Sequence, residues 1–255
     1  VGPPARAAAG RGRAGVLMPT FGSLFAGIGG MDLGLERSGW ECKWQVEIDP
    51  FCRRVLAKHW PSVPKHDDVR TFPPDSGDWR VDLIAGGFPC QDISGAGKGA
   101  GLDGERSGLW REQFRIIRDL RPRYVVVENS PVLLVRGLDR ILGELASLGF
   151  DAEWSCLSAC SLGAPHTRER LFIVAHSDGL DGEAWLGAGH DRKGQASLQR
   201  DRIRERHEHW VESASRAARG ADELPGRVDR TRSIGNAVLP DVAEFIGRRL
   251  MEAIR

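Results

Sequence analysis

The feature that most constrains the fold is a regular alternation of short apolar runs and helix-like segments between Phe21 and His176. Short apolar runs bounded by turn residues are typical of buried strands, and the longer segments between them have helical spacing. The expected strands cover residues 21–26, 43–49, 81–87, 121–129, 151–159 and 168–177, and the expected helices cover 31–39, 50–60, 109–120 and 138–150. Strands that alternate with helices in this way build a sheet with helices on both faces. The sequence therefore predicts an α/β fold with a doubly wound, mostly parallel sheet.

Local signals predict where several helices begin and end. Pro50 opens the second helix and Pro240 opens a final helix, because proline is tolerated in the first turn. Gly39 is a stop signal for the first helix. In that helix we expect Leu33 and Leu35 to lie on or near one face.

A change of composition after Ser177 indicates a second kind of region. Residues 178–231 have few apolar runs, many glycines and arginines, and scattered tryptophans, so we expect a small, irregular appendage. The main domain is expected to comprise 18–177 and 232–255. Residues 1–17 lack the apolar stretch of a secretory signal and are interpreted as a disordered leader, or as translation from an upstream start. The leader arginines suit either nucleic-acid contact or simple solvation.

Charge and cysteine content bound the function classes. The net charge of +1 neither favours nor excludes a polyanionic partner, because a local basic face is enough to bind one. Five irregularly spaced cysteines argue against a disulfide framework and favour a reducing cytoplasm. No apolar run has transmembrane length, so no membrane partner is expected. Cys156, Cys160 and His166 lie near one another in sequence but lack a fourth zinc ligand, so we expect no metal site.

A glycine-rich turn, FAGIGG, joins the first expected strand to the first helix and places Gly27, Gly29 and Gly30 there. Such turns can merely cap a helix, but they also let a ligand approach the backbone. Glu47 ends the next strand and can accept hydrogen bonds from two ribose hydroxyls, while Asp68 can hold an adenine amine. The turn lacks the G-x-G-x-x-G spacing of dinucleotide folds and the lysine of a P-loop. The pattern therefore favours an adenosyl ligand without a pyrophosphate.

Reactive side chains follow the later strands. Cys90 lies behind a proline in GGFPCQDISG, directly after the strand 81–87, and Glu128 ends the apolar run YVVVEN. Burial at that position would raise the Glu128 pKa toward a useful protonated state. Arg168 and Arg170 are two residues apart, so they lie on the same face of a strand. Taken alone, Cys90 suits a structural thiol, Glu128 suits a helix cap, and the two arginines suit a basic strand end. Together they predict a nucleophile, a general acid and a binder of an anion or carbonyl.

These motifs resemble those of the cytosine-5 DNA methyltransferase family. FAGIGG is similar to its first motif, GGFPCQ to its nucleophile motif, ENS to its glutamate motif, HTRER to its Q-x-R-x-R motif, and GNAVLP to the last motif, which completes the cofactor pocket. The resemblance covers about residues 20–177 and 232–255. Ser130 replaces a usual valine and His166 a usual glutamine, and neither change removes a catalytic group. The resemblance implies a class I, Rossmann-like methyltransferase fold that uses S-adenosyl-L-methionine.

The resemblance also implies a role for each site residue. Cys90 would add to C6 of a cytosine flipped out of the duplex. Glu128 would protonate or hydrogen-bond N3, and Arg170, with Arg168 beside it, would hold O2 and a neighbouring phosphate. The product would be 5-methylcytosine. The positions that match cofactor contacts are Phe25, Gly27, Gly29, Gly30, Glu47, Ile48, Asp68, Val69, Leu109, Asn236 and Ala237.

The implied partner is double-stranded DNA, read by a short target-recognition region at 178–231. Arginines around 200–206 and 227–232 are candidates for phosphate contact, although the first group suits a solvated helix face equally well. A monomeric enzyme in the cytoplasm of a bacterium or a phage-infected host is expected, with a cognate restriction endonuclease as a possible partner. Two alternatives stay open: a tRNA cytosine-5 methyltransferase and a catalytically inactive DNA-binding regulator. The target sequence is not encoded in any motif that we recognise.

Overall fold

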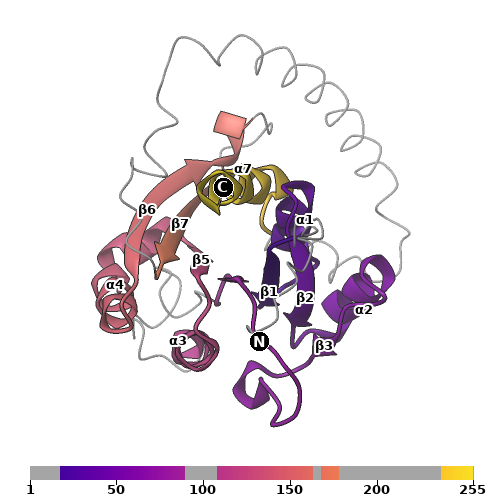
Figure 1. The fold of residues 1–255 in the computed structure, drawn as a ribbon. Helices are drawn as coiled ribbons and strands as arrows, with labels where there is room; N and C mark the ends of the chain where they lie inside the picture. Colours follow the sequence, from indigo (N-terminus) through magenta and orange to yellow (C-terminus); the bar gives the residue numbers. More distant parts are fainter. Residues whose placement is uncertain (1–17, 90–107, 163–167, 178–236, 255) are drawn as a thin grey trace, which may run out of the picture.

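A computed structural model describes residues 18–89, 108–162, 168–177 and 237–254, and these build one sheet covered by helices (Figure 1). The strands are β1 (Thr20–Leu24), β2 (Glu41–Val46), β3 (Lys65–His66), β4 (Leu83–Gly86), β5 (Tyr124–Asn129), β6 (Asp151–Ser158) and β7 (Glu169–His176). They form a seven-stranded sheet in the order β3-β2-β1-β4-β5-β7-β6. The pairs among β1 to β5 are parallel, and β7 is antiparallel to both β5 and β6. The predicted mostly parallel α/β sheet is confirmed.

The helices begin where the sequence indicated. They are α1 (Gly30–Arg37), α2 (Pro50–His59), α3 (Leu109–Leu120), α4 (Leu138–Ser147) and α7 (Pro240–Ile254), with 3-10 turns η1 (Val69–Thr71), η3 (Pro131–Val135) and η4 (Ala159–Leu162). Pro50 and Pro240 are the first residues of α2 and α7, as predicted. The expectation for Leu33 and Leu35 is wrong, because residues two apart lie on nearly opposite sides of a helix. Leu35 is 1% exposed and Leu33 is 36% exposed.

Two apolar cores lie on the two faces of the sheet, which is why the central strands read as continuous apolar runs. On β5, Val125 and Val127 pack toward α3 and α4, whereas Tyr124 and Val126 pack toward α1 and α7. Figure 1 shows α1 and α7 side by side on one face, away from α3 and α4. Alternate residues of one strand therefore hold both helical layers in place.

The helix α7 brings the end of the chain back onto the first strand–helix unit. A side chain at Gly34 is sterically excluded there, since its Cβ would lie 2.2 Å from the Pro240 carbonyl oxygen. The Trp40 indole Nε1 donates a hydrogen bond to the Gly247 carbonyl oxygen at 3.1 Å. This close packing places residues 237–239 over the glycine turn after β1.

The chain order of the strands reverses between β1 and β4, so the crevice at their carboxyl ends is a topological switch point. Ligands of open α/β sheets bind at such a point. Across the described part of the chain, no helix is both long and apolar enough to span a membrane.

Candidate functional site

A cavity of about 410 Å³ opens at the carboxyl ends of β1, β2, β4 and β5. Its volume lies within the range of small-molecule pockets. Residues expected to contact a cofactor line it from the parallel half of the sheet, from η1, from α3 and from the segment before α7. These are Phe25, Gly27, Gly30, Glu47, Ile48, Asp68, Val69, Leu109 and Ala237. Residues expected to act on a substrate line the same cavity at β5 and β7, namely Glu128, Arg168 and Arg170.

The glycine turn after β1 is clamped by the acid at the end of β2. Gly27 has a φ of +57°, and no described atom lies within 4 Å of the position that a Cβ would occupy. Its N–H donates to Oε2 of Glu47 at 2.7 Å, and Oε1 of Glu47 accepts from the Asp49 N–H at 2.8 Å. Each carboxylate oxygen can accept a further hydrogen bond. The turn therefore offers open space beside a fixed acceptor, which suits a bound sugar.

The other two glycines of the turn make room for protein rather than for open space. A Cβ on Gly29 would lie 2.4 Å from the Trp60 ring, and one on Gly30 would lie 2.1 Å from the Val238 carbonyl oxygen. Gly29 does not line the cavity, whereas Gly30 and Ala237 do. Asn236 lies outside the described residues. The glycine turn thus serves both the cavity and the packing of the returning chain.

Phe25 adopts a left-handed backbone conformation with a φ of +54° at the mouth of the same turn. A bulky residue in this region is uncommon, and such strain is characteristic of functional sites. Its ring packs against the core on the α3 side. Phe25 and Leu109, the first residue of α3, therefore give the cavity apolar walls.

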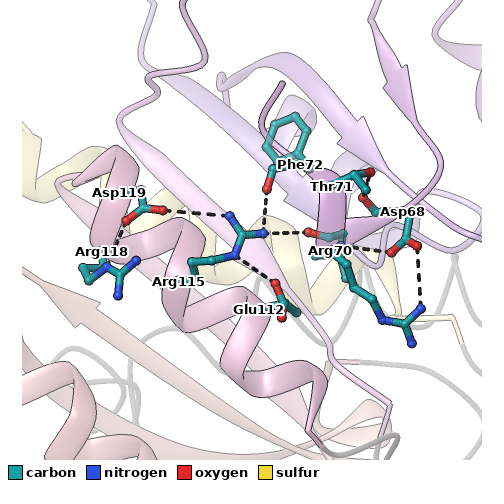
Figure 2. A network of polar contacts seen from close by, with 9 residues as sticks. Asp68, Arg70, Thr71, Phe72, Glu112, Arg115, Arg118 and Asp119 are labelled. Atoms are coloured by element: carbon teal, nitrogen blue, oxygen red, sulfur yellow. Dashed lines mark hydrogen bonds and ion pairs between the residues drawn. The ribbon is translucent and has the colours of Figure 1, made fainter. Parts of the chain in front are cut away.

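Asp68 lies directly before η1 and lines the cavity. Its Oδ1 accepts from the Arg70 N–H at 2.9 Å, and its Oδ2 lies 3.6 Å from the Arg70 guanidinium (Figure 2). The next residue, Val69, is buried in the core. The Asp68 carboxylate is thereby held at the N-terminus of the 3-10 turn, where it remains partly exposed to the cavity.

Glu128 and Arg170 form an ion pair at the inner end of the cavity, where Nε of Arg170 lies 3.1 Å from Oε1 of Glu128. Glu128 is only 8% exposed. Burial raises the pKa of its carboxyl, while the Arg170 and Arg168 guanidiniums oppose the increase. The direction of this shift agrees with the sequence-based expectation. A carboxyl with a raised pKa can donate a hydrogen bond or a proton to a base placed in the cavity.

Two neighbours of this pair were not singled out from the sequence. A Cβ on Gly87 would lie 2.5 Å from Oε2 of Glu128, so only glycine leaves space for that carboxyl. The buried Asn129 amide donates through Nδ2 to the Phe88 carbonyl oxygen at 3.0 Å. The Asn129 hydrogen bond fixes the chain at Phe88, and Cys90 lies outside the described residues. The glycine pair in GGFPC and the asparagine in ENS were the sequence signals that could have pointed to Gly87 and Asn129.

A buried polar cluster beneath the glycine turn was also missed. Ser23 lines the cavity, and its hydroxyl donates to Oδ2 of Asp32 at 3.0 Å, while Nε2 of Gln45 donates to Oδ1 at 2.7 Å. Asp32 is fully buried, and burial raises its pKa from 3.8 to about 6. Oε1 of Gln45 has no hydrogen-bond partner among the described residues. The cluster ties β1, β2 and α1 together below the site.

Metal chemistry receives no support from the part of the chain that the structure describes, where no group of three or more His, Cys, Asp or Glu could hold an ion. Cys156 and Cys160 are free thiols there, and His166 is outside the described residues. The cavity is lined in one part by apolar side chains and the Glu47 carboxylate, and in another by the Glu128 carboxyl and the guanidiniums of Arg168 and Arg170.

Comparison with known proteins places this site in a family context. The sequence pattern of the C-5 cytosine-specific DNA methylase family matches residues 19–217. The type II methyltransferase M2.BsuMI of Bacillus subtilis (strain 168) is 37% identical over 164 residues, covering 60% of this chain and 41% of that protein. The type II methyltransferase M.DsaV of Dactylococcopsis salina is 36% identical over 164 residues, covering 62% and 46%. The chain thus spans less than half the length of these two relatives.

Solved structures show the same architecture. A candidate DNA modification methyltransferase encoded within an E. coli prophage superposes with a TM-score of 0.53 at 26% identity, covering 62% of this chain and 46% of that chain. The S. pombe Dnmt2 methyltransferase gives a TM-score of 0.55 at 19% identity, covering 65% and 51%. The second likeness concerns the fold alone.

Proposed function

Because the chain belongs to the C-5 cytosine-specific DNA methylase family, we propose that it is a DNA (cytosine-5-)-methyltransferase that uses S-adenosyl-L-methionine. One observation carries the proposal: buried Glu128 and its ion-pair partner Arg170 line the same cavity as the glycine turn and Glu47. A methyl donor and a cytosine must meet in one cavity for the transfer to occur. The arrangement provides an adenosyl-type half and a base-binding half side by side.

The residues present fit this cofactor. Open space over Gly27 admits the ligand close to the backbone, and the fixed Glu47 carboxylate suits the two ribose hydroxyls. Asp68 would accept from the adenine amine, with Phe25 and Leu109 as apolar walls. When bound, S-adenosyl-L-methionine supplies the methyl group.

The base-binding half would hold the flipped cytosine through its polar edge. Glu128, whose pKa is raised by burial, would donate a proton or hydrogen bond to N3, so that charge developing on the ring is neutralised. Arg170 would donate to O2, and Arg168 would contact O2 or a neighbouring phosphate. General acid catalysis of this kind contributes on the order of 10²–10⁴ in rate.

Cys90 would provide the nucleophile from the loop after β4. Its thiolate would form a bond to C6 and so make C5 nucleophilic. A C5–CH₃ bond would then form as the methyl–sulfur bond of the bound cofactor breaks, with S-adenosyl-L-homocysteine as the leaving group. Loss of the C5 proton and elimination of the Cys90 thiolate restore the aromatic ring as 5-methylcytosine. The hydrogen bond from Asn129 to Phe88 fixes the chain that leads to this loop, which supports the assignment of the nucleophile to it.

The target is proposed to be a specific sequence in duplex DNA, with residues 178–231 making the sequence-reading contacts. Relatives named type II methyltransferases support a role beside a cognate restriction endonuclease in a bacterial or phage-infected cytoplasm. We propose that the enzyme acts as a monomer.

The test is covalent trapping on duplex DNA that contains 5-fluorocytosine, with S-adenosyl-L-methionine present. Fluorine at C5 blocks the final elimination, so a stable protein–DNA adduct is expected for the wild type. Cys90→Ser is expected to lose the adduct while it retains cofactor binding, and Cys160→Ser, which changes an exposed thiol, is the matched control. An adduct that persists in Cys90→Ser would falsify the assigned nucleophile. Methylation sequencing of DNA from cells that express the protein identifies the target, and the absence of any 5-methylcytosine above background contradicts the proposed activity.

A further inference from the structure

Arg115 of α3 is not part of the cavity wall, yet it connects α3 to the turn that carries Asp68. One guanidinium nitrogen, Nη2, donates to the Val69 carbonyl oxygen at 2.9 Å and to the Phe72 carbonyl oxygen at 2.7 Å. These carbonyls lie at the two ends of η1, so a single group holds the whole 3-10 turn. Figure 2 shows the guanidinium between the helix and the turn.

Acidic neighbours on the same helix hold the guanidinium in this orientation. Nε donates to Oε2 of Glu112 at 2.9 Å, and Nη1 lies 3.9 Å from Oδ2 of Asp119. The planar guanidinium of arginine has N–H donors that point in several fixed directions, so it can bond to several partners at once. The ammonium of lysine cannot reproduce this geometry. The contacts are therefore specific to arginine rather than to positive charge.

The turn that Arg115 holds fixes one wall of the cavity. Asp68 caps η1 through the Arg70 N–H, so its carboxylate moves wherever the turn moves. Val69 lines the cavity in the first position of the turn, and Leu109 lines it from the first residue of α3. Arg115 thus links η1 and α3, the two elements that both line the proposed adenine site.

We propose that Arg115 is a positioning residue for the cofactor, which places Asp68 and Val69 opposite Leu109 so that the adenine ring is bound between η1 and α3. This inference rests on the proposed function, because it assumes an adenosyl cofactor in the cavity. It assigns the guanidinium to cofactor affinity and not to the chemistry at Glu128 and Arg170.

The test is equilibrium binding of S-adenosyl-L-methionine to the full chain carrying Arg115→Met, which keeps most of the side-chain stem but removes the donors. We expect affinity to fall by about tenfold or more, as for the loss of charged hydrogen bonds. The KM for the cofactor is expected to rise by a similar factor, with kcat at saturating cofactor and the KM for DNA within about twofold of wild type. Arg115→Lys is expected to be intermediate. Arg118→Met is the matched control, because Arg118 is exposed on the same helix and pairs with Asp119.

A second readout does not depend on the cofactor. Amide hydrogen exchange of Arg70, Thr71 and Phe72, whose N–H groups are bonded within the turn, is expected to accelerate in Arg115→Met. Protection in β1, β2 and α3 should be unchanged. A uniform loss of protection would mean that Arg115 serves general stability, which overturns the inference.

The outcomes separate this inference from the proposed function. Wild-type affinity in Arg115→Met, or an equal loss in Arg118→Met, overturns the positioning role alone. A wild-type protein that binds no S-adenosyl-L-methionine overturns the proposed function and the inference with it.

Discussion

Nε of Arg170 lies 3.1 Å from Oε1 of Glu128, and this ion pair joins two neighbouring strands that run in opposite directions. Burial favours the neutral carboxyl, whereas the guanidinium favours the carboxylate. A base that enters the cavity would compete with Arg170 for the same oxygen atoms. The pKa of Glu128 is therefore expected to change when a base displaces Arg170 from its carboxyl.

Replacing Glu128 by glutamine removes the proposed proton donor while it keeps the size of the side chain. We expect kcat for methyl transfer to DNA to fall by about 10²–10⁴, with cofactor affinity within about twofold of wild type. Glu244→Gln is a suitable control, because the Glu244 side chain has similar exposure (15% against 11%) and also pairs with an arginine, Arg248, but on α7. The rate of both variants is measured as single-turnover transfer of a labelled methyl group to DNA. Equal rates for Glu128→Gln and wild type would remove Glu128 from the chemistry.

Gly87→Ala tests the space beside the same carboxyl. The added Cβ would lie 2.5 Å from Oε2 of Glu128, so the buried carboxyl must shift from its present position beside Arg170. We expect at least about a tenfold loss of kcat and a destabilisation of about 1–3 kcal/mol from overpacking. Gly143→Ala adds a Cβ where no described atom lies within 4 Å, inside the helix α4, and is expected to stabilise by about 0.5–1 kcal/mol. Denaturant unfolding and enzyme kinetics distinguish the two variants. Full activity of Gly87→Ala would contradict the predicted displacement of the Glu128 carboxyl.

Glu47→Ala removes the acceptor that fixes the glycine turn. The Gly27 N–H then loses its 2.7 Å hydrogen bond, and the proposed ribose contact disappears as well. We expect the dissociation constant for S-adenosyl-L-methionine to rise by about tenfold or more, since hydrogen bonds to a charged group are among the stronger ones. Calorimetric titration checks this, with Glu41→Ala on the exposed start of β2 as the control. Unchanged affinity would show that the cofactor pocket is placed wrongly.

Asp32 is expected to make the stability of the fold depend on pH. Its folded pKa of about 6 exceeds its ordinary value of 3.8, so the folded state binds the proton more tightly than the unfolded state. The contribution to stability is present below about pH 4 and is lost as the pH rises to about 6. The difference between the two pKa values of Asp32 corresponds to about 3 kcal/mol of stability.

Asp32→Asn should abolish this dependence and stabilise the protein at pH 7. The introduced asparagine can still accept a hydrogen bond from the Ser23 hydroxyl. If the Gln45 amide turns over, the asparagine N–H can also donate to Oε1 of Gln45, which now has no partner among the described residues. Urea unfolding between pH 4 and 8 measures the effect. Asp139→Asn changes an exposed acid in the first turn of α4 and is expected to keep the wild-type pH profile. A mutant profile that still falls between pH 4 and 6 would assign the dependence to other groups.

Much of the architecture followed from local patterns. The apolar runs at Val125–Val127 and Leu171–Val174 predicted strands buried on both faces, and Pro50 and Pro240 predicted the starts of two helices. The motif residues at strand ends were expected at one rim, and those within the described residues line one cavity, with the exception of Gly29. The positions of Cys90 and Asn236 stay predictions, because both lie outside the described residues. These inferences succeeded because side-chain periodicity and turn chemistry depend on residues only a few positions apart.

The tertiary structure alone decided the direction of β7, and with it the site. Arg168 and Arg170 stand at the start of that strand, so in a parallel strand they would lie at the opposite edge of the sheet from the end of β5. Because β7 is antiparallel, they meet Glu128. The close approach of Gly87 to the Glu128 side chain and the hydrogen bond from Arg115 to Val69 of η1 likewise join residues more than forty positions apart. Such contacts depend on how the layers pack, and the local pattern of a single sequence does not specify that geometry.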